Sequence, residues 1–314
     1  MKQFISLHDV PDPAALVAKA RALKYNPLAG QQLGKHKTLG LLFFNASLRT
    51  RMSTQRAAQN LGMEVMVMNM DKEGWQLEFD TGAVMAAGSQ EHIKEAAAVV
   101  SQYCDIIGIR AFPSLVNRAE DYAEKLLTGF ARYATVPVIS LESATLHPLQ
   151  SLADWLTIAE HSPVPRPKVV LTWAPHVKAL PQSVANSFVQ WLRQAPVELV
   201  VTHPGGYELA PEFGEGVPVE YDQDKALAGA DFVYAKNWSA YHPYGKILGN
   251  FPDWMITKEK MALTNNGYFM HCLPVRRNVV VADAVLDSDR SLVIAQAENR
   301  IYAAQAVIAT LLEK

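Results

Sequence analysis

The stretch Leu39-Gly-Leu-Leu-Phe-Phe44-Asn-Ala-Ser47-Leu48-Arg49-Thr50-Arg51 decides how this sequence is interpreted. Residues 39–44 form a short apolar run typical of a buried strand, and residues 50–61 have the mixed periodicity of a helix. The turn between them lies at a predicted helix N-terminus, where unpaired N–H groups and the helix dipole favour an anion. The hydroxyls of Ser47 and Thr50 and the guanidinium groups of Arg49 and Arg51 would complete a phosphate site. The plainer alternative is a solvated arginine face on a helix.

The composition describes a soluble globular protein whose anion site is local. The chain has 314 residues, of which 49% are hydrophobic, and this length favours about two domains. Its net charge of −2 argues against a nucleic-acid groove and a polybasic membrane surface, so the expected partner is a small molecule. No run approaches a transmembrane helix and residues 1–10 lack a signal-peptide core, so we expect a cytoplasmic protein.

Cysteine use argues against two further classes of protein. Only Cys104 and Cys272 are present, far apart in the chain and without metal-ligand spacing. The sequence therefore predicts neither a disulfide framework nor a zinc site. Cys104 is expected to be a plain buried residue.

Apolar runs alternate with amphipathic helical stretches at residues 39–44, 64–69, 106–110, 138–140, 168–173, 197–201, 232–235 and 267–272. This is the βαβ rhythm of parallel sheets covered by helices. A proline-rich interruption between Glu160 and Lys168 is expected to follow a helix near the domain junction. We predict an α/β protein with a first domain at 1–150, a second at 151–290 and a C-terminal helix within 291–314.

Two further polar segments follow predicted strands of the first domain. Arg110 ends the run Ile-Gly-Ile-Arg, and His147-Pro-Leu-Gln150 follows the next strand. Ligands of parallel α/β sheets gather outside the carboxyl ends of the strands, so these side chains are expected near the phosphate turn. Arg110 and His147 could donate to a carbonyl oxygen, and Gln150 could accept from an amide NH2. Taken singly, Arg110 could be a surface charge and His147 a structural histidine.

Three motifs together resemble the carbamoyltransferases, a family that includes the aspartate and ornithine carbamoyltransferases. Ser47-Leu-Arg-Thr-Arg51 is similar to the family's S-x-R-T-R motif, His147-Pro-Leu-Gln150 to H-P-x-Q, and His271-Cys-Leu-Pro274 to the ornithine-type H-C-L-P. They occur in the family's order. The resemblance spans nearly the whole chain and includes Glu298-Asn-Arg300 near its end.

The resemblance implies two doubly wound parallel-sheet domains with the active site in the cleft between them. It also implies a knot in the second domain, where the chain after Trp238 threads a loop near residues 179–182, and a C-terminal helix that returns to the first domain. The implied assembly is a homotrimer, with Trp75 and the Gln90 loop shared across subunits. No metal and no organic cofactor are implied.

The resemblance also assigns roles to individual residues. The implied catalytic residues are Arg49, Arg110, His147, Gln150 and Cys272. The implied carbamoyl phosphate ligands are Ser47, Leu48, Arg49, Thr50, Arg51, Trp75, Arg110, His147, Gln150, Cys272, Leu273 and Arg300. The implied acylornithine ligands are Glu142, His176, Lys236 and Arg276. Plainer roles exist for several of these: Trp75 as a loop or core aromatic, Glu142 as a helix cap, His176 as a loop residue and Lys236 as a snorkelling lysine.

Lys236 bears on which amine accepts the carbamoyl group. Ornithine carbamoyltransferases carry an aspartate at this position, which binds the free α-ammonium of ornithine. A cation there would repel that ammonium, whereas it can pair with a carboxylate once the amine is acylated. Lys236-Asn-Trp238 thus resembles the N-acetylornithine and N-succinylornithine branch, whose members serve an acylated arginine biosynthesis pathway.

Gln90 and Val280 bear on the acyl group. The acetyl branch has a glutamate and a lysine at these positions, and the succinyl branch typically has a proline where Gln90 stands, so the chain departs from both. A glutamate would repel the distal carboxylate of a succinyl group, whereas neutral Gln90 could donate a hydrogen bond to it. We therefore predict N2-succinyl-L-ornithine as acceptor, with N-acetyl-L-ornithine as the alternative.

Two other classes of function are considered. A nucleotide-dependent oxidoreductase would share the βαβ rhythm, but the chain has no G-x-G-x-x-G after its first strand and no Walker sequence. A catalytically inactive paralogue that binds carbamoyl phosphate is disfavoured by the intact Arg49, Arg110, His147, Gln150 and Cys272. The expected reaction gives N2-succinyl-L-citrulline and phosphate.

Overall fold

The computed structural model describes residues 1–86 and 88–313, which fold as a two-domain α/β protein with parallel sheets. The first compact unit contains Met1–Ser114, Ala119–Leu149 and the residues from Arg300 onward. The second contains Leu115–Arg118 and Gln150–Asn299. Two helices continue across these boundaries, α7 (Pro148–His161) and α13 (Val293–Leu312).

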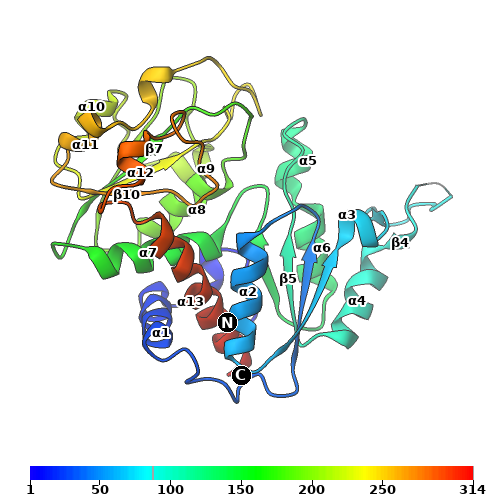
Figure 1. Cartoon of the computed structure of the whole chain (residues 1–314). Helices are drawn as coiled ribbons and strands as arrows, with labels where there is room; N and C mark the ends of the chain where they lie inside the picture. Colours follow the sequence, from blue (N-terminus) through cyan, green and yellow to red (C-terminus); the bar gives the residue numbers. More distant parts are fainter. Residues whose placement is uncertain (87, 314) are drawn as a thin grey trace. The chain divides into compact units, whose positions relative to one another are not determined.

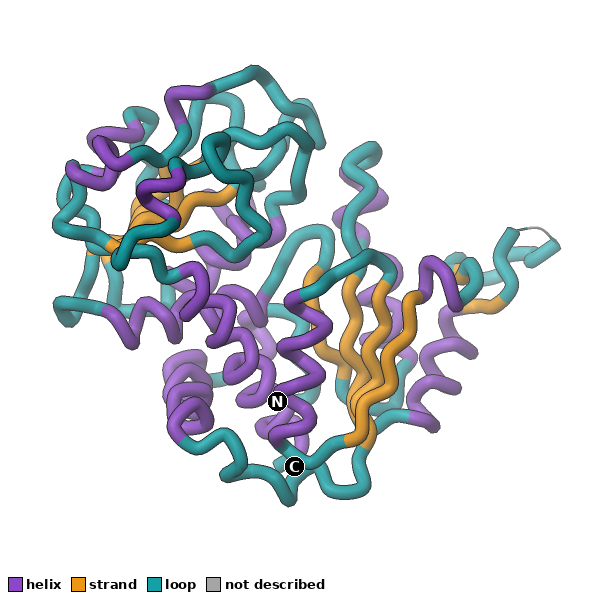
Figure 2. Tube along the Cα trace, in the orientation of Figure 1, coloured by secondary structure: helices purple, strands orange, loops and turns teal. Residues whose placement is uncertain are grey.

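The first unit is built on a parallel sheet with strand order β2-β1-β5-β6 (Figure 2). Its strands are β1 (Thr38–Phe43), β2 (Glu64–Asn69), β5 (Ile106–Arg110) and β6 (Val138–Glu142). Phe43 is in register with Arg110, and Arg110 with Glu142 after a one-residue irregularity. The carboxyl ends of three strands therefore bring Arg110, Glu142 and the turn after Phe43 to one edge of the sheet.

The first unit also contains several helical elements, some of which lie against this sheet (Figure 1). They are η1 (Leu7–Asp9), α1 (Pro13–Tyr25), α2 (Arg49–Asn60), α3 (Met70–Glu73), α4 (Ile93–Tyr103), α5 (Arg118–Ala123, of which Arg118 belongs to the second unit) and α6 (Lys125–Tyr133). Ile93 of α4 and Phe130 of α6 share one core cluster with Ile107 of β5. This side of the sheet is closed by apolar side chains, so a polar site belongs at the strand ends.

The second unit has a parallel sheet with strand order β10-β9-β7-β8. Its strands are β7 (Lys168–Trp173), β8 (Glu198–Thr202), β9 (Phe232–Lys236) and β10 (Tyr268–Met270). The shorter helical elements are α8 (Ser183–Leu192), α9 (Pro211–Gly214), α10 (Gln223–Leu227), η2 (Pro252–Trp254), α11 (Lys258–Ala262) and α12 (Asp283–Leu286). Lys236 ends β9 in register with Trp173, so it lies at the carboxyl edge, immediately before Asn237.

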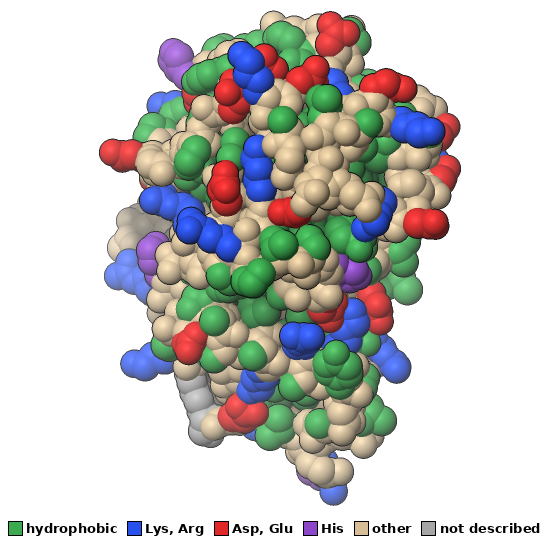
Figure 3. Space-filling view, turned by 90° about the vertical axis from the view of Figure 1, so that its left-hand side faces the viewer, with side chains coloured by type: hydrophobic (Ala, Val, Ile, Leu, Met, Phe, Trp, Pro, Cys, Tyr) green, Lys and Arg blue, Asp and Glu red, His purple; other side chains and the backbone are tan. Residues whose placement is uncertain are grey.

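All eight strands predicted from apolar runs are present, and a helix does precede the proline-rich interruption. A short parallel pair, β3 (Leu77–Glu78) with β4 (Glu91–His92), was not predicted, because two-residue strands carry no apolar run. Figure 3 shows positive and negative side chains interspersed over one face, as expected from the near-neutral charge. Within the described residues no helix is long and apolar enough to cross a membrane.

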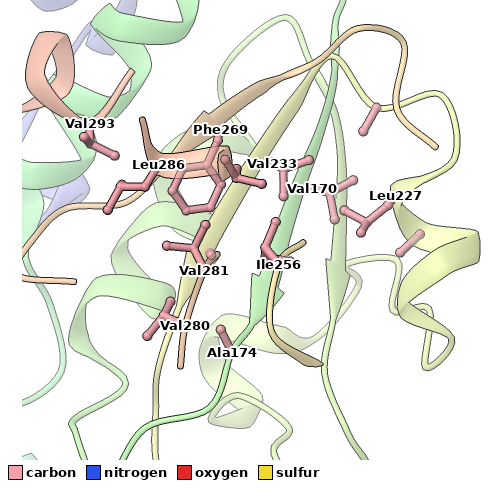
Figure 4. Packing of buried hydrophobic residues seen from close by; sticks show 14 residues of the cluster. Val170, Ala174, Leu227, Val233, Ile256, Phe269, Val280, Val281, Leu286 and Val293 are labelled. Carbon is pink, nitrogen blue, oxygen red and sulfur yellow. The ribbon is translucent and has the colours of Figure 1, made fainter. Parts of the chain in front are cut away.

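Phe269 anchors the core of the second unit. Its side chain is fully buried and lies among Val170, Val233, Val281 and Leu286 (Figure 4). Phe269→Ala is expected to lower the free energy of unfolding by about 3–5 kcal/mol, because it removes a buried aromatic ring and leaves a cavity. Urea denaturation checks this, with exposed Phe112→Ala as control. A loss below about 1 kcal/mol would contradict the assigned packing.

Candidate functional site

The predicted phosphate turn has the expected strand–turn–helix form. β1 ends at Phe43, and α2 begins at Arg49 with Leu48 as its N-cap residue. Within the described residues no side-chain hydrogen bond caps this N-terminus, as expected where the start of a helix binds an anion. Arg51 donates to Asn69 and lies with its guanidinium carbon 4.8 Å from the centre of the Phe43 ring. Ser47 and Arg49, both partly buried, precede it in the same turn.

Thr50 brings together residues that are far apart in the sequence. Its buried hydroxyl accepts from Arg110 Nη1 at 3.4 Å and from Arg300 Nη2 at 2.5 Å. Both arginines are themselves buried. The first unit thus places two guanidinium groups beside the first turn of α2, which is the electrostatic environment an anion requires.

Glu142 lies in the same cluster. Its buried carboxylate accepts from Arg110 Nη1, and the Nε2 atom of His147 is 3.4 Å from the same oxygen. Sequence reasoning assigned Glu142 to the acylornithine group, and that assignment stays a prediction. In this structure the carboxylate orients Arg110 and His147, the two groups expected to donate to a carbonyl oxygen.

Trp75 precedes β3 and Gln90 precedes β4, so both lie near the start of this parallel pair. Trp75 is 53% exposed and donates from Nε1 to Glu91 at 2.8 Å, while the backbone N–H of Gln90 donates to the Gln76 carbonyl at 3.0 Å. Residues 79–86 and 88–90, which join the two strands, project away from the sheet of their unit (Figure 1). The pairing of β3 with β4 and the bond from Gln90 to Gln76 therefore hold Trp75 and Gln90 near the base of this projecting segment.

The second unit holds the Gln150 end of the second motif and the third motif. Gln150 donates to Asp154 at 2.7 Å, and Gln296 donates to the same carboxylate oxygen at 2.7 Å. Gln296 in turn accepts from the backbone N–H of His271 at 3.0 Å. Cys272 follows, and Leu273 has a left-handed backbone with φ of 55°. Gln150 and the start of the H-C-L-P loop are thus joined through Asp154, which sequence reasoning missed.

Basic side chains gather around His176 in the second unit. His176 Nε2 accepts from Arg276 Nε at 3.2 Å, and its Nδ1 lies 2.9 Å from the Lys178 carbonyl oxygen. Burial, and then the positive charges of Lys236 and Arg276, lower the pKa of His176 below its ordinary value. Lys236 is buried and donates to the Asn237 carbonyl at 3.0 Å. The cluster of His176, Lys178, Lys236 and Arg276, called here the cationic cluster, suits an anionic ligand.

Val280 is fully buried in the apolar core of the second unit and packs near Ile256 and Val281 (Figure 4). Its side chain therefore offers only apolar contact. Cys104, expected to be a plain buried residue, is buried, and burial raises its thiol pKa. Tyr234, which the sequence did not single out, is buried beside Asp154 and Cys272.

Comparison with known proteins identifies the family. The family model "Aspartate/ornithine carbamoyltransferase, carbamoyl-P binding domain" matches residues 2–160, and the "Asp/Orn binding domain" matches residues 180–311. The chain belongs to the aspartate/ornithine carbamoyltransferase family.

Individual relatives cover nearly the whole chain. An N-succinylornithine carbamoyltransferase of Bacteroides thetaiotaomicron is 49% identical and covers 100% of this chain and 99% of its own length. An N-acetylornithine carbamoyltransferase of Xanthomonas campestris is 38% identical, with 99% and 98% covered. A mutant N-acetyl-L-ornithine transcarbamylase complexed with carbamyl phosphate and N-succinyl-L-norvaline is 38% identical, with a TM-score of 0.92 and 99% and 100% covered.

Proposed function

We propose that this chain transfers the carbamoyl group of carbamoyl phosphate to the δ-amine of N2-succinyl-L-ornithine, which gives N2-succinyl-L-citrulline and phosphate. The observation that carries the choice of acceptor is the cationic cluster, in which Lys236 and Arg276 act on His176. A free α-ammonium would be repelled there, whereas an acylated ornithine is anionic and would be attracted. The full-length similarity to relatives named N-succinylornithine carbamoyltransferase supports this choice.

The first unit would bind carbamoyl phosphate. Ser47, Arg49, Thr50, Arg51 and the N–H groups that begin α2 would hold the phosphate, with Leu48 supplying backbone. Arg110, Thr50 and His147 would donate to the carbonyl oxygen, where negative charge develops as the amine attacks. Arg300 would add a further cation through its bond to Thr50.

The second unit would bind the acceptor and the carbamoyl amide. Lys236 and Arg276 would pair with carboxylates of the acylornithine, and His176 would contact the same ligand beside them. Gln150, Cys272 and Leu273 would contact the carbamoyl NH2. The δ-amine must attack as the neutral base, although its pKa in water is about 10. Desolvation and nearby cations would lower that pKa, and the leaving phosphate would take up the proton.

Assembly and topology complete the proposal. The exposed Trp75, close to the start of the β3–β4 pair, would reach a neighbouring subunit of a homotrimer together with Gln90. A knot is supported by the hydrogen bonds from Ser239 to the Leu180 carbonyl, which hold the chain after β9 against the proposed loop. The final helix would pack as part of the first domain, and the domains would close on their ligands.

The experiment that tests the acceptor compares ornithine, N-acetylornithine and N-succinylornithine with carbamoyl phosphate in one citrulline-product assay. We expect clear preference for the succinyl compound. Preference for the acetyl compound would keep the reaction but replace the acceptor, and activity on free ornithine would refute the argument from Lys236. Absence of phosphate release that depends on an acceptor would favour a carbamoyl phosphate-binding paralogue.

Gln90→Glu tests the acyl group. A glutamate would repel the distal carboxylate of a succinyl group, so kcat/KM for N-succinylornithine is expected to fall about tenfold or more while that for N-acetylornithine does not. Gln76→Glu places the same charge near but not at the specificity position, and serves as control. An equal loss on both acceptors would contradict a selective role for Gln90.

A further inference from the structure

Asp154 is a fully buried carboxylate one helical turn after Gln150 on α7. Its Oδ1 atom accepts from Gln150 Nε2 and from Gln296 Nε2, each at 2.7 Å. An amide has a donor end and an acceptor end, and a carboxylate oxygen that receives both bonds must face the NH2 group of each. Asp154 therefore fixes the orientation of two side-chain amides.

This orientation decides what Gln150 offers a ligand. With its NH2 group on Asp154, Gln150 presents its carbonyl oxygen Oε1 elsewhere. That oxygen is buried and has no hydrogen-bond partner within residues 1–86 and 88–313. A buried acceptor of this kind favours a ligand group that donates and disfavours one that only accepts. A carbamoyl group ends in such a donor, its NH2.

The same carboxylate also reaches the third motif. Gln296, oriented by Asp154, uses its Oε1 to accept from the backbone N–H of His271 at 3.0 Å. His271 Nδ1 then accepts from the backbone N–H of Leu273 at 2.9 Å. Asp154 thus orients both Gln150 and the loop that carries Cys272.

Tyr234 is a buried neighbour of Asp154. Its hydroxyl lies beside Asp154 and Cys272, and burial together with the negative charge of Asp154 raises the pKa of Tyr234 well above its ordinary value. The phenol therefore stays protonated and uncharged.

We propose that Asp154 is a positioning residue that holds Gln150 as a hydrogen-bond acceptor, so that the site selects a carbamoyl NH2 over an oxygen in the same place. The proposal rests on the function proposed above. If Asp154 has this role, the preference of the site for a ligand group that donates over one that only accepts depends on Asp154, although Asp154 would not touch the substrate.

Phosphonoacetamide and phosphonoacetate test this, because they differ in having NH2 or oxygen at the relevant position. The inhibition constant of each compound is measured in competition with carbamoyl phosphate. The ratio of the two constants gives the preference of the site for the amide. The wild-type protein is expected to prefer the amide, and Asp154→Leu, which keeps the branched shape but removes the acceptor, is expected to reduce that preference about tenfold. Asp154→Asn retains an Oδ1 acceptor, so this variant is expected to keep most of the preference for phosphonoacetamide.

Thr157→Val is the matched control. Thr157 lies one turn further along α7 and accepts from Asn299 of α13 at 2.9 Å, so the variant loses a buried hydrogen bond between the same two helices without touching Gln150. The Thr157→Val protein is expected to keep the wild-type preference for phosphonoacetamide over phosphonoacetate. A folded Asp154→Leu protein with wild-type preference would overturn the proposal, and Asp154→Ala provides the same test if the leucine variant does not fold. A wild-type protein that binds neither compound would overturn the proposed function instead.

Discussion

Arg110→Ala is expected to reduce kcat by about a hundredfold to a thousandfold, which is the usual effect of removing one donor from a developing oxyanion. Arg110 is buried at the end of β5, donates to Thr50 at 3.4 Å, and pairs with Glu142. Its charge and position would stabilise the carbonyl oxygen more in the transition state than in bound carbamoyl phosphate. Steady-state kinetics on N-succinylornithine, with both substrates varied, measure the effect.

The same substitution also disturbs stability, and the two effects can be separated. Removing Arg110 takes away the guanidinium group that pairs with the buried Glu142 carboxylate, so the free energy of unfolding is expected to fall by about 3 kcal/mol. The double variant Arg110→Ala/Glu142→Gln should recover most of that stability but none of the turnover. Recovery of turnover in the double variant would mean that Arg110 serves only to neutralise Glu142.

The fold could be predicted because the central strands of both sheets are buried on both faces. β1, β5, β7 and β9 appear in the sequence as short apolar runs, which parallel sheets covered by helices require. The pair β3–β4 could not be predicted, because each strand has two partly buried residues and is held by pairing rather than by burial.

Part of the candidate site could be predicted, from continuous motifs, from the carboxyl ends of the strands and from the family resemblance. The turn before α2 was identified from adjacent residues, whereas the convergence of Arg110 and Arg300 on Thr50 joins residues 60 and 250 positions apart. The spacing of Gln150 and Asp154, four residues apart on a predicted helix, was a signal that could have been used. No sequence feature indicated that Val280 is buried, because a valine in a loop can face either a core or a ligand.

Lys236→Asp is expected to abolish the proposed preference for an acylated acceptor. Lys236 is buried at the carboxyl end of β9, where a carboxylate would repel the anionic acylornithine and attract a free ammonium. We expect kcat/KM for N-succinylornithine to fall by about a hundredfold or more, and the ratio of ornithine to succinylornithine activity to rise. Lys236→Met removes the positive charge without adding a negative one. This variant should lose activity on N-succinylornithine without gaining activity on ornithine.

The pKa of His176 provides a readout of the same variant that does not depend on turnover. In the wild-type protein burial, and then the charge of Lys236, lower this pKa, so His176 is neutral at pH 7. An aspartate at position 236 would favour the protonated ring instead, so the pKa should rise in Lys236→Asp and rise less in Lys236→Met. NMR titration of the His176 ring measures the order of the three values. If the pKa of His176 is the same in all three proteins, Lys236 does not act on His176. The cationic cluster would then no longer support an acylated acceptor.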